Sequence, residues 1–189
     1  VQETLAIVGE SGCGKTVTSK AVMRLLDRSG GKIKEGSQIL FQGQDLLALR
    51  KKELNQIRGN KISMIFQDSM TSLNPTMTVG KQIMENILTH KKIPKAEARQ
   101  WAKELLELVE IPNPEMRLKQ YPHQLSGGMR QRVMIAIALA LTPALLIADE
   151  PTTALDVTIQ AQLMDLLASL KERFHMSVIL VTHDLGIVA

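Results

Sequence analysis

The chain has 189 residues, of which 44% are hydrophobic and 3% aromatic, and it has a net charge of +4 with a single cysteine. This length is enough to bury a sizeable core. A single cysteine excludes an internal disulfide, and such low cysteine content fits a reducing compartment. Because aromatic platforms for base stacking are scarce, we interpret the basic clusters as solvated surface and expect no nucleic-acid partner.

The first expected strand, Thr4–Val8, runs directly into the glycine-rich stretch GESGCGKT at residues 9–16. This stretch fits the pattern G-x-x-x-x-G-K-[ST], placed between a strand and a helix as the pattern requires. Its backbone N–H groups would surround phosphates, Lys15 would reach the β- and γ-phosphates, and the Thr16 hydroxyl would bind Mg²⁺. The expected phosphate-binding residues are Gly9, Glu10, Ser11, Gly12, Cys13, Gly14, Lys15 and Thr16. For Cys13 itself, filling a small-residue position is the simpler interpretation.

The middle of the chain changes character after a second expected strand, Ile62–Phe66. Before it, residues 36–43 predict a strand and a turn in a small antiparallel patch. After it comes Gln67, whose amide could orient water or contact a metal, although alone it would be an ordinary strand cap. From there to Gln124 apolar residues recur at helical spacing and no strand is expected, which predicts a helical insert.

The stretch LSGGMRQR, residues 125–132, opens a further apolar helix with two adjacent glycines. Inside a helix each glycine costs roughly 1 kcal/mol relative to alanine. A Ser-Gly-Gly start leaves backbone N–H groups free at the positive end of the helix, which suits a phosphate. Ser126, Gly127 and Gly128 therefore predict a second phosphate site in a chain that already has one.

The last third of the chain contains two more apolar strands that end in polar residues. Ala144–Ala148 is followed by Asp149 and Glu150, and Val178–Thr182 is followed by His183. Asp149 would meet the Mg²⁺ ion through a water molecule, and Glu150 would be the general base for an attacking water. The alternatives are a helix cap for the acidic pair and a structural role for His183.

Near-continuous apolar strands of this length are typical of a parallel sheet that is covered on both faces. Ligands of such sheets bind at the carboxyl ends of the strands. We therefore expect the glycine loop, Gln67, Asp149, Glu150 and His183 to meet at one edge of one sheet.

Together these motifs resemble the ATP-binding subunits of ABC transporters. Residues 9–16 are similar to the Walker A loop, 145–150 to Walker B with its catalytic glutamate, and Gln67 to the Q-loop. Residues 125–129 are similar to the LSGGQ signature with Met129 in place of glutamine, 154–156 to the D-loop, and His183 to the switch histidine. The resemblance covers nearly the whole chain.

The resemblance implies an α/β fold: a P-loop NTPase (RecA-like) core with a mainly parallel sheet, a small antiparallel β patch and an inserted helical subdomain. It divides the chain into 1–68 and 126–189, which form the core, and 69–125, the helical subdomain. ATP and Mg²⁺ are the implied cofactors, with Lys15, Gln67, Glu150 and His183 in catalysis and Thr16, Gln67 and Asp149 at the metal.

The resemblance also explains the second phosphate site. In the family two ATPase domains pair head to tail, so Ser126, Gly127 and Gly128 would face the ATP held by the partner. Asp156 of the D-loop would join this shared site. ATP would close the dimer and hydrolysis would let it open.

The sequence of residues 65–83, 121–140 and 149–162 is most similar to that of the D-type ATPase of dipeptide and oligopeptide permeases, a group that includes nickel importers. This implies an F-type ATPase as partner, or a second copy, together with transmembrane permease subunits, and a peripheral position on the cytoplasmic face of the inner membrane. ABC ATPases of DNA repair or translation remain alternatives. We also expect a fragment, because the family's adenine-stacking aromatic and C-terminal region have no counterpart.

Overall fold

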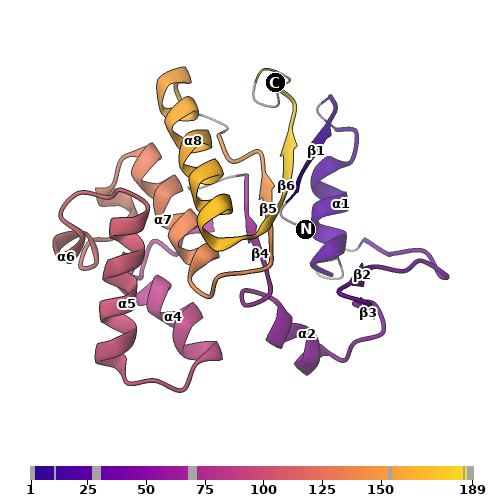
Figure 1. The fold of residues 1–189 in the computed structure, drawn as a ribbon, viewed down its shortest axis with the longest axis horizontal. Coiled ribbons are helices and arrows are strands. Elements are labelled where there is room, and N and C mark those ends of the chain that lie inside the picture. Colours follow the sequence, from indigo (N-terminus) through magenta and orange to yellow (C-terminus); the bar gives the residue numbers. More distant parts are fainter. Residues whose placement is uncertain are drawn as a thin grey trace.

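The computed structural model describes residues 3–10, 12–26, 31–67, 72–152, 155–184 and 186. Its centre is a parallel sheet of four strands in the order β1-β6-β5-β4 (Figure 1). The strands are β1 (Thr4–Val8), β4 (Ile62–Ile65), β5 (Leu145–Asp149) and β6 (Ser177–Thr182). The predicted parallel sheet is confirmed, and all four strands point their carboxyl ends to the same edge.

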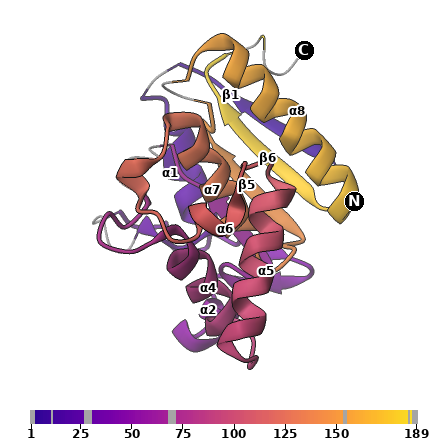
Figure 2. The ribbon, with the colours of Figure 1, turned by 90° about the vertical axis from the view of Figure 1, so that its left-hand side faces the viewer.

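Both faces of the sheet are covered by helices, as the apolar strands predicted. Helix α1 (Lys15–Val22) lies on one face, and α7 (Gly127–Leu139) and α8 (Val157–Phe174) lie on the other (Figures 1 and 2). Successive residues of β5 alternate between these layers, because side chains of a strand point to opposite faces. Leu146 and Ala148 join the core beneath α7 and α8, whereas Ile147 joins the core beneath α1.

The predicted antiparallel patch is present but short. It consists of β2 (Leu40–Phe41) and β3 (Gln44–Asp45), joined by a two-residue turn. Both turn residues have positive φ angles, 50° at Gln42 and 79° at Gly43, as a tight hairpin requires. Helix α2 (Lys51–Ile57) follows the patch and was not expected from the sequence.

Beyond β4 the chain forms the helices that the sequence predicted for this region. They are α4 (Val79–His90), α5 (Lys95–Leu108) and the short α6 (Pro114–Arg117), followed by a 3₁₀ turn, η2 (Pro122–Gln124). Val79, Ile83 and Ile87 form the buried stripe of α4, and each has no exposed surface. This stripe belongs to the same apolar core as the buried face of α7, so the helical region packs directly on α7. None of the described helices is long and apolar enough to cross a membrane.

Candidate functional site

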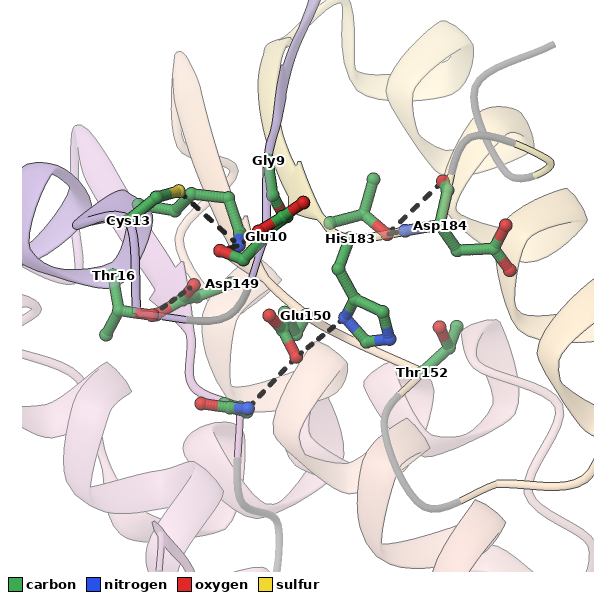
Figure 3. Close-up of polar contacts among 12 residues, drawn as sticks. Gly9, Glu10, Cys13, Thr16, Asp149, Glu150, Thr152, His183 and Asp184 are labelled. Atoms are coloured by element: carbon green, nitrogen blue, oxygen red, sulfur yellow. Dashed lines mark hydrogen bonds and ion pairs between the residues drawn. The ribbon is translucent and has the colours of Figure 1, made fainter.

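Polar residues from four strands meet at the carboxyl edge of the sheet. The glycine loop leaves β1, His183 follows β6, Asp149 ends β5 with Glu150 next to it, and Gln67 follows β4. Figure 3 shows Thr16, Asp149, Glu150 and His183 side by side at this edge. The convergence predicted from the strand pattern is therefore present in the structure.

The glycine loop has the backbone of a phosphate cradle. Gly12 and Gly14 have φ angles of 86° and 97°, a left-handed conformation that side chains disfavour. Gly14 is the N-cap of α1, so the first N–H groups of this helix have no acceptor within it. Such a helix end attracts anions. Ser11 lies outside the described residues.

Lys15 holds its ammonium group over the loop. The side chain is 7% exposed, and its Nζ donates to the carbonyl of Gly9 at 2.7 Å and to that of Glu10 at 2.8 Å. The thiol of Cys13, which is exposed, lies 3.9 Å from the same nitrogen (Figure 3). A single cation thus stands where phosphates would enter the cradle.

Thr16 and Asp149 supply the oxygen atoms that a magnesium ion prefers. The Thr16 hydroxyl donates to Oδ1 of Asp149 at 3.0 Å, across the gap between α1 and β5. Burial raises the pKa of the Asp149 carboxyl above its ordinary value; the Thr16 hydrogen bond opposes this, and the nearby Glu150 carboxylate adds to it. The described residues contain no cluster of three or more His, Cys, Asp or Glu side chains that could bind a metal alone. One carboxylate and one hydroxyl fit Mg²⁺ held jointly with phosphate oxygens and water.

Asp149→Asn is expected to raise the melting temperature of the nucleotide-free protein at neutral pH. The folded protein raises the pKa of Asp149, so ionising this carboxyl destabilises the fold. The penalty is fully present above the folded pKa and disappears as the pH falls towards the unfolded value. Thermal unfolding of both proteins across the acidic range should therefore show a difference at neutral pH that vanishes in acid. A variant less stable than the wild type at neutral pH would contradict this account.

Glu150 is held at the centre of the edge by groups from two other strands. Its Oε2 accepts a hydrogen bond from Nε2 of Gln67 at 3.0 Å and lies 3.3 Å from Nδ1 of His183 (Figure 3). Its backbone has a φ angle of 47°, and its N–H donates to the carbonyl of Val181 at 2.8 Å. A left-handed glutamate is strained, and strain of this kind concentrates at functional sites.

The position of His183 depends on neighbours that the sequence analysis did not single out. The buried hydroxyl of Thr182 accepts the N–H of Asp184 at 3.0 Å, and the carboxylate of Asp184 accepts the N–H of Gly186 at 2.8 Å. These bonds form a tight turn directly after β6. The available signal was the pair Thr-x-Asp, whose short polar side chains favour such turns.

A cavity of about 270 Å³ joins these groups. Its walls come from the glycine loop, the start of α1 and the two residues that follow β4 and β5. The lining residues are Gly12, Gly14, Lys15, Thr16, Val17, Gln67 and Glu150. A cationic cradle, the Thr16 hydroxyl and a candidate base therefore line one space.

Comparison with known proteins identifies the family. The model of the family described as "ABC transporter" matches residues 1–153. The chain belongs to this family. It is 62% identical to the oligopeptide transport ATP-binding protein OppD and 59% identical to the dipeptide transport ATP-binding protein DppD, both of Bacillus subtilis, and 99% of the chain is covered in each case. It spans only 52% and 56% of those proteins, about half of their length.

The fold is shared with solved ABC structures. The dimeric structure of the ATP-binding cassette MJ0796 in a post-hydrolysis state, bound to ADP and Pi, superimposes with a TM-score of 0.84. It is 31% identical, and the match covers 98% of this chain and 77% of that one. The P-loop NTPase fold with its parallel sheet is thereby confirmed.

The predicted signature and D-loop residues Ser126 and Asp156 lie at helix starts and do not line the cavity. Ser126 is the N-cap of α7, and its hydroxyl accepts the N–H of Met129 at 3.3 Å. Asp156 caps α8 in the same way, accepting the N–H of Ile159 at 3.0 Å. A side chain at Gly128 would come within 3.1 Å of Ile159, so a glycine lets α7 approach α8 closely. Ala154 of the predicted D-loop lies outside the described residues.

Proposed function

We propose that the chain is the ATP-binding and ATP-hydrolysing part of an ABC importer that takes up di- and oligopeptides across the bacterial inner membrane. The observation that carries this proposal is the cavity lined by Lys15, Thr16 and Glu150, with Asp149 bonded to the Thr16 hydroxyl beside it. The peptide cargo is supported by the similarity to OppD and DppD. A nickel importer is the alternative cargo assignment, since the ATPase does not itself determine the cargo.

Each polar group of the edge has a distinct role in this proposal. Lys15 and the N–H groups of residues 9–16 bind the phosphates, while Thr16, Gln67 and, through water, Asp149 hold Mg²⁺. When bound, the metal neutralises charge that develops on the transferred phosphoryl group. Glu150 takes a proton from the attacking water, and His183 and Gln67 orient the water and the γ-phosphate.

The contacts of Glu150 with Gln67 and His183 support these proposed roles. Both partners bind the same carboxylate oxygen, Oε2. A carboxylate tied in this way is positioned but is less free to take a proton from water. Hydrolysis would therefore begin when Gln67 and His183 turn from Glu150 towards the γ-phosphate and the attacking water.

The chain is proposed to work as one half of a pair. Segments 1–68 and 126–189 would form the nucleotide-binding core, and 69–125 the helical subdomain. Ser126, Gly127, Gly128 and Asp156 would complete the ATP site of the opposite subunit. This fits their place outside the cavity of their own chain, and it fits the dimers described for MJ0796. An F-type ATPase is the proposed partner, with a second copy of the chain as the alternative.

In the membrane assembly, transmembrane permease subunits would bind the ATPase pair at the cytoplasmic face of the inner membrane. The ATPase would be a peripheral subunit there. Proteoliposomes that hold the chain with its permease subunits and substrate-binding protein would settle the cargo. Stimulation of ATP hydrolysis by di- or oligopeptides is expected, and stimulation by Ni²⁺ instead would transfer the assignment to nickel import.

Light scattering on the Glu150→Gln protein tests the shared-site proposal. MgATP is expected to convert the monomer to a dimer, alone or after mixing with an F-type ATPase, and EDTA should prevent the change. The matched variant Glu150→Gln/Ser126→Arg, which places a large side chain at the start of α7, should remain monomeric when alone. A Glu150→Gln protein that stays monomeric with MgATP under every mixing condition would contradict the proposal.

A further inference from the structure

Of the described residues 72–78 in the loop that leads from Gln67 into α4, one is buried. Leu73 is 2% exposed and belongs to the same apolar core as Val79 and Ile83 of α4. The residues after it, 74–76, are exposed and form a turn in which Oδ1 of Asn74 accepts both the N–H and the hydroxyl of Thr76. The loop 72–78 therefore enters the core once and then turns back to the start of α4.

Gln82 closes this loop from the first turns of α4. Its side chain is 8% exposed, and its Oε1 accepts the N–H of Asn74 at 2.9 Å. Its Nε2 donates to the carbonyl of Asn74 at 3.0 Å and to that of Met77 at 3.0 Å. Both amide hydrogens and the carbonyl oxygen are thus used, and every partner is loop backbone.

A buried amide with three backbone bonds fixes the loop more firmly than packing alone. Apolar contact at Leu73 has no preferred direction, whereas the two donors and one acceptor of Gln82 fit a single loop geometry. Removing the amide would take away the partner that Gln82 gives to the N–H and carbonyl groups of Asn74 and to the carbonyl of Met77. The loop would then gain freedom even though Leu73 stays in the core.

The start of α4 is itself tied to the segment that leads to the signature. The N–H of Val79 donates to the carbonyl of Gln120, and the N–H of Gly80 donates to that of Leu118, both at 2.9 Å. A side chain at Gly80 would come within 2.8 Å of the Leu118 carbonyl. These contacts fix the first turn of α4, which carries Gln82, to the segment that contains Leu118 and Gln120.

The other end of the connection is Gln67, which binds Glu150. Gln67 lies two residues after Ile65, the last residue of β4, which is paired with Ala148 in the sheet. Five residues separate Gln67 from Leu73 in the sequence. Because each residue spans at most about 3.6 Å, the buried position of Leu73 limits how far Gln67 can move.

We propose that Gln82 is a positioning residue for Gln67: by fixing loop 72–78 to the start of α4, it keeps the Gln67 amide where it can turn from the Glu150 carboxylate to the γ-phosphate and the attacking water. This inference rests on the proposed ATPase function, since Gln82 lies outside the nucleotide cavity and acts through Gln67. It assigns Gln82 an effect on turnover and none on nucleotide binding.

The experiment is a double-mutant cycle with Gln82→Met, Gln67→Ala and the double variant, measured by steady-state ATP hydrolysis. Gln82→Met is expected to lower kcat roughly 5- to 10-fold and to leave KM for ATP within about twofold. In the Gln67→Ala background the same substitution should change kcat by less than about twofold, because coupled residues are not additive. The matched control is Gln100→Met on α5, whose exposed amide contacts Glu104 and whose loss should leave kcat unchanged.

Hydrogen exchange tests the bonds between Gln82 and loop 72–78 without relying on activity. In Gln82→Met the Asn74 amide should exchange about tenfold faster, while amides in the second half of α4 stay as protected as in the wild type. Gln82→Glu provides a second variant of equal size, because a carboxylate turned towards two carbonyls cannot replace the amide donors. It should lower kcat as far as Gln82→Met does.

Three results would overturn this inference alone, provided that the wild type hydrolyses ATP. They are additive effects of Gln82→Met and Gln67→Ala, an unchanged kcat in Gln82→Met, and unchanged exchange of its Asn74 amide. A wild type that binds ATP but does not hydrolyse it in any assembly would overturn the proposed function and this inference with it. The two failures are therefore distinguishable.

Discussion

Glu150→Gln will lower kcat for ATP hydrolysis by roughly 100-fold or more, the usual contribution of a general base, and will leave the affinity for ATP within about threefold. The amide has the size of the carboxylate but cannot take a proton from water. Nucleotide binding depends on the glycine loop, Lys15 and Thr16, none of which changes. Phosphate release measures the first quantity, and calorimetric titration with a non-hydrolysable ATP analogue measures the second.

The matched control is Glu85→Gln on the exposed side of α4, which should hydrolyse ATP at the wild-type rate. Because glutamine is no less tolerant of a left-handed backbone than glutamate, Glu150→Gln should also melt at nearly the wild-type temperature. Hydrolysis by Glu150→Gln at the rate of the wild type would exclude Glu150 as the base. The proton would then have to leave by another route, for which His183 is the next candidate.

Lys15→Met will weaken ATP binding by roughly 10- to 100-fold, the equivalent of one lost hydrogen bond to a charged group. Methionine is also unbranched and of similar length, so it can fill the same space between the glycine loop and α1. What disappears is the cation, which now donates to the carbonyls of Gly9 and Glu10 and would donate to phosphate oxygens instead. Calorimetric titration with MgATP measures the loss.

Lys52→Met on α2 is the control for this substitution, because Lys52 is exposed and lies away from the cavity. It should bind ATP as the wild type does. Thermal unfolding should show that Lys15→Met is folded. An unchanged dissociation constant in a folded Lys15→Met protein would refute the placement of phosphates at this loop.

The sequence was sufficient to predict the sheet and the set of residues at its edge. Apolar strands followed by polar residues identify both the sheet and the end at which ligands bind, because strand direction is implicit in a parallel arrangement. Helix α8 has apolar residues that repeat at helical spacing through eighteen residues, a pattern that is visible in the sequence. Helix α2 was missed because its seven residues bury only Leu54 and Ile57, too few for a period to be visible.

The geometry within the site could not be predicted in the same way. That Glu150 adopts a left-handed backbone has no local signal, since glutamate does not favour that conformation, and its N–H bonds to Val181 on a strand distant in sequence. The partners of Thr16 and Gln67 are likewise 133 and 83 residues away along the chain. Motifs predict which chemical groups are present, whereas their pairing depends on tertiary contacts between strands.

The order of strands has a consequence for how the protein acquires its site during synthesis. β1 lies at the edge of the described sheet, and its neighbour there is β6, with Thr4 paired to Val178. β1 therefore cannot pair with its neighbour in this sheet until β6 has been synthesised, and long-range pairings of this kind form slowly. Until then the glycine loop has no fixed base and β1 presents an open edge to other chains. Nascent chains that stall before residue 177 would therefore be prone to aggregation and unable to hold a nucleotide.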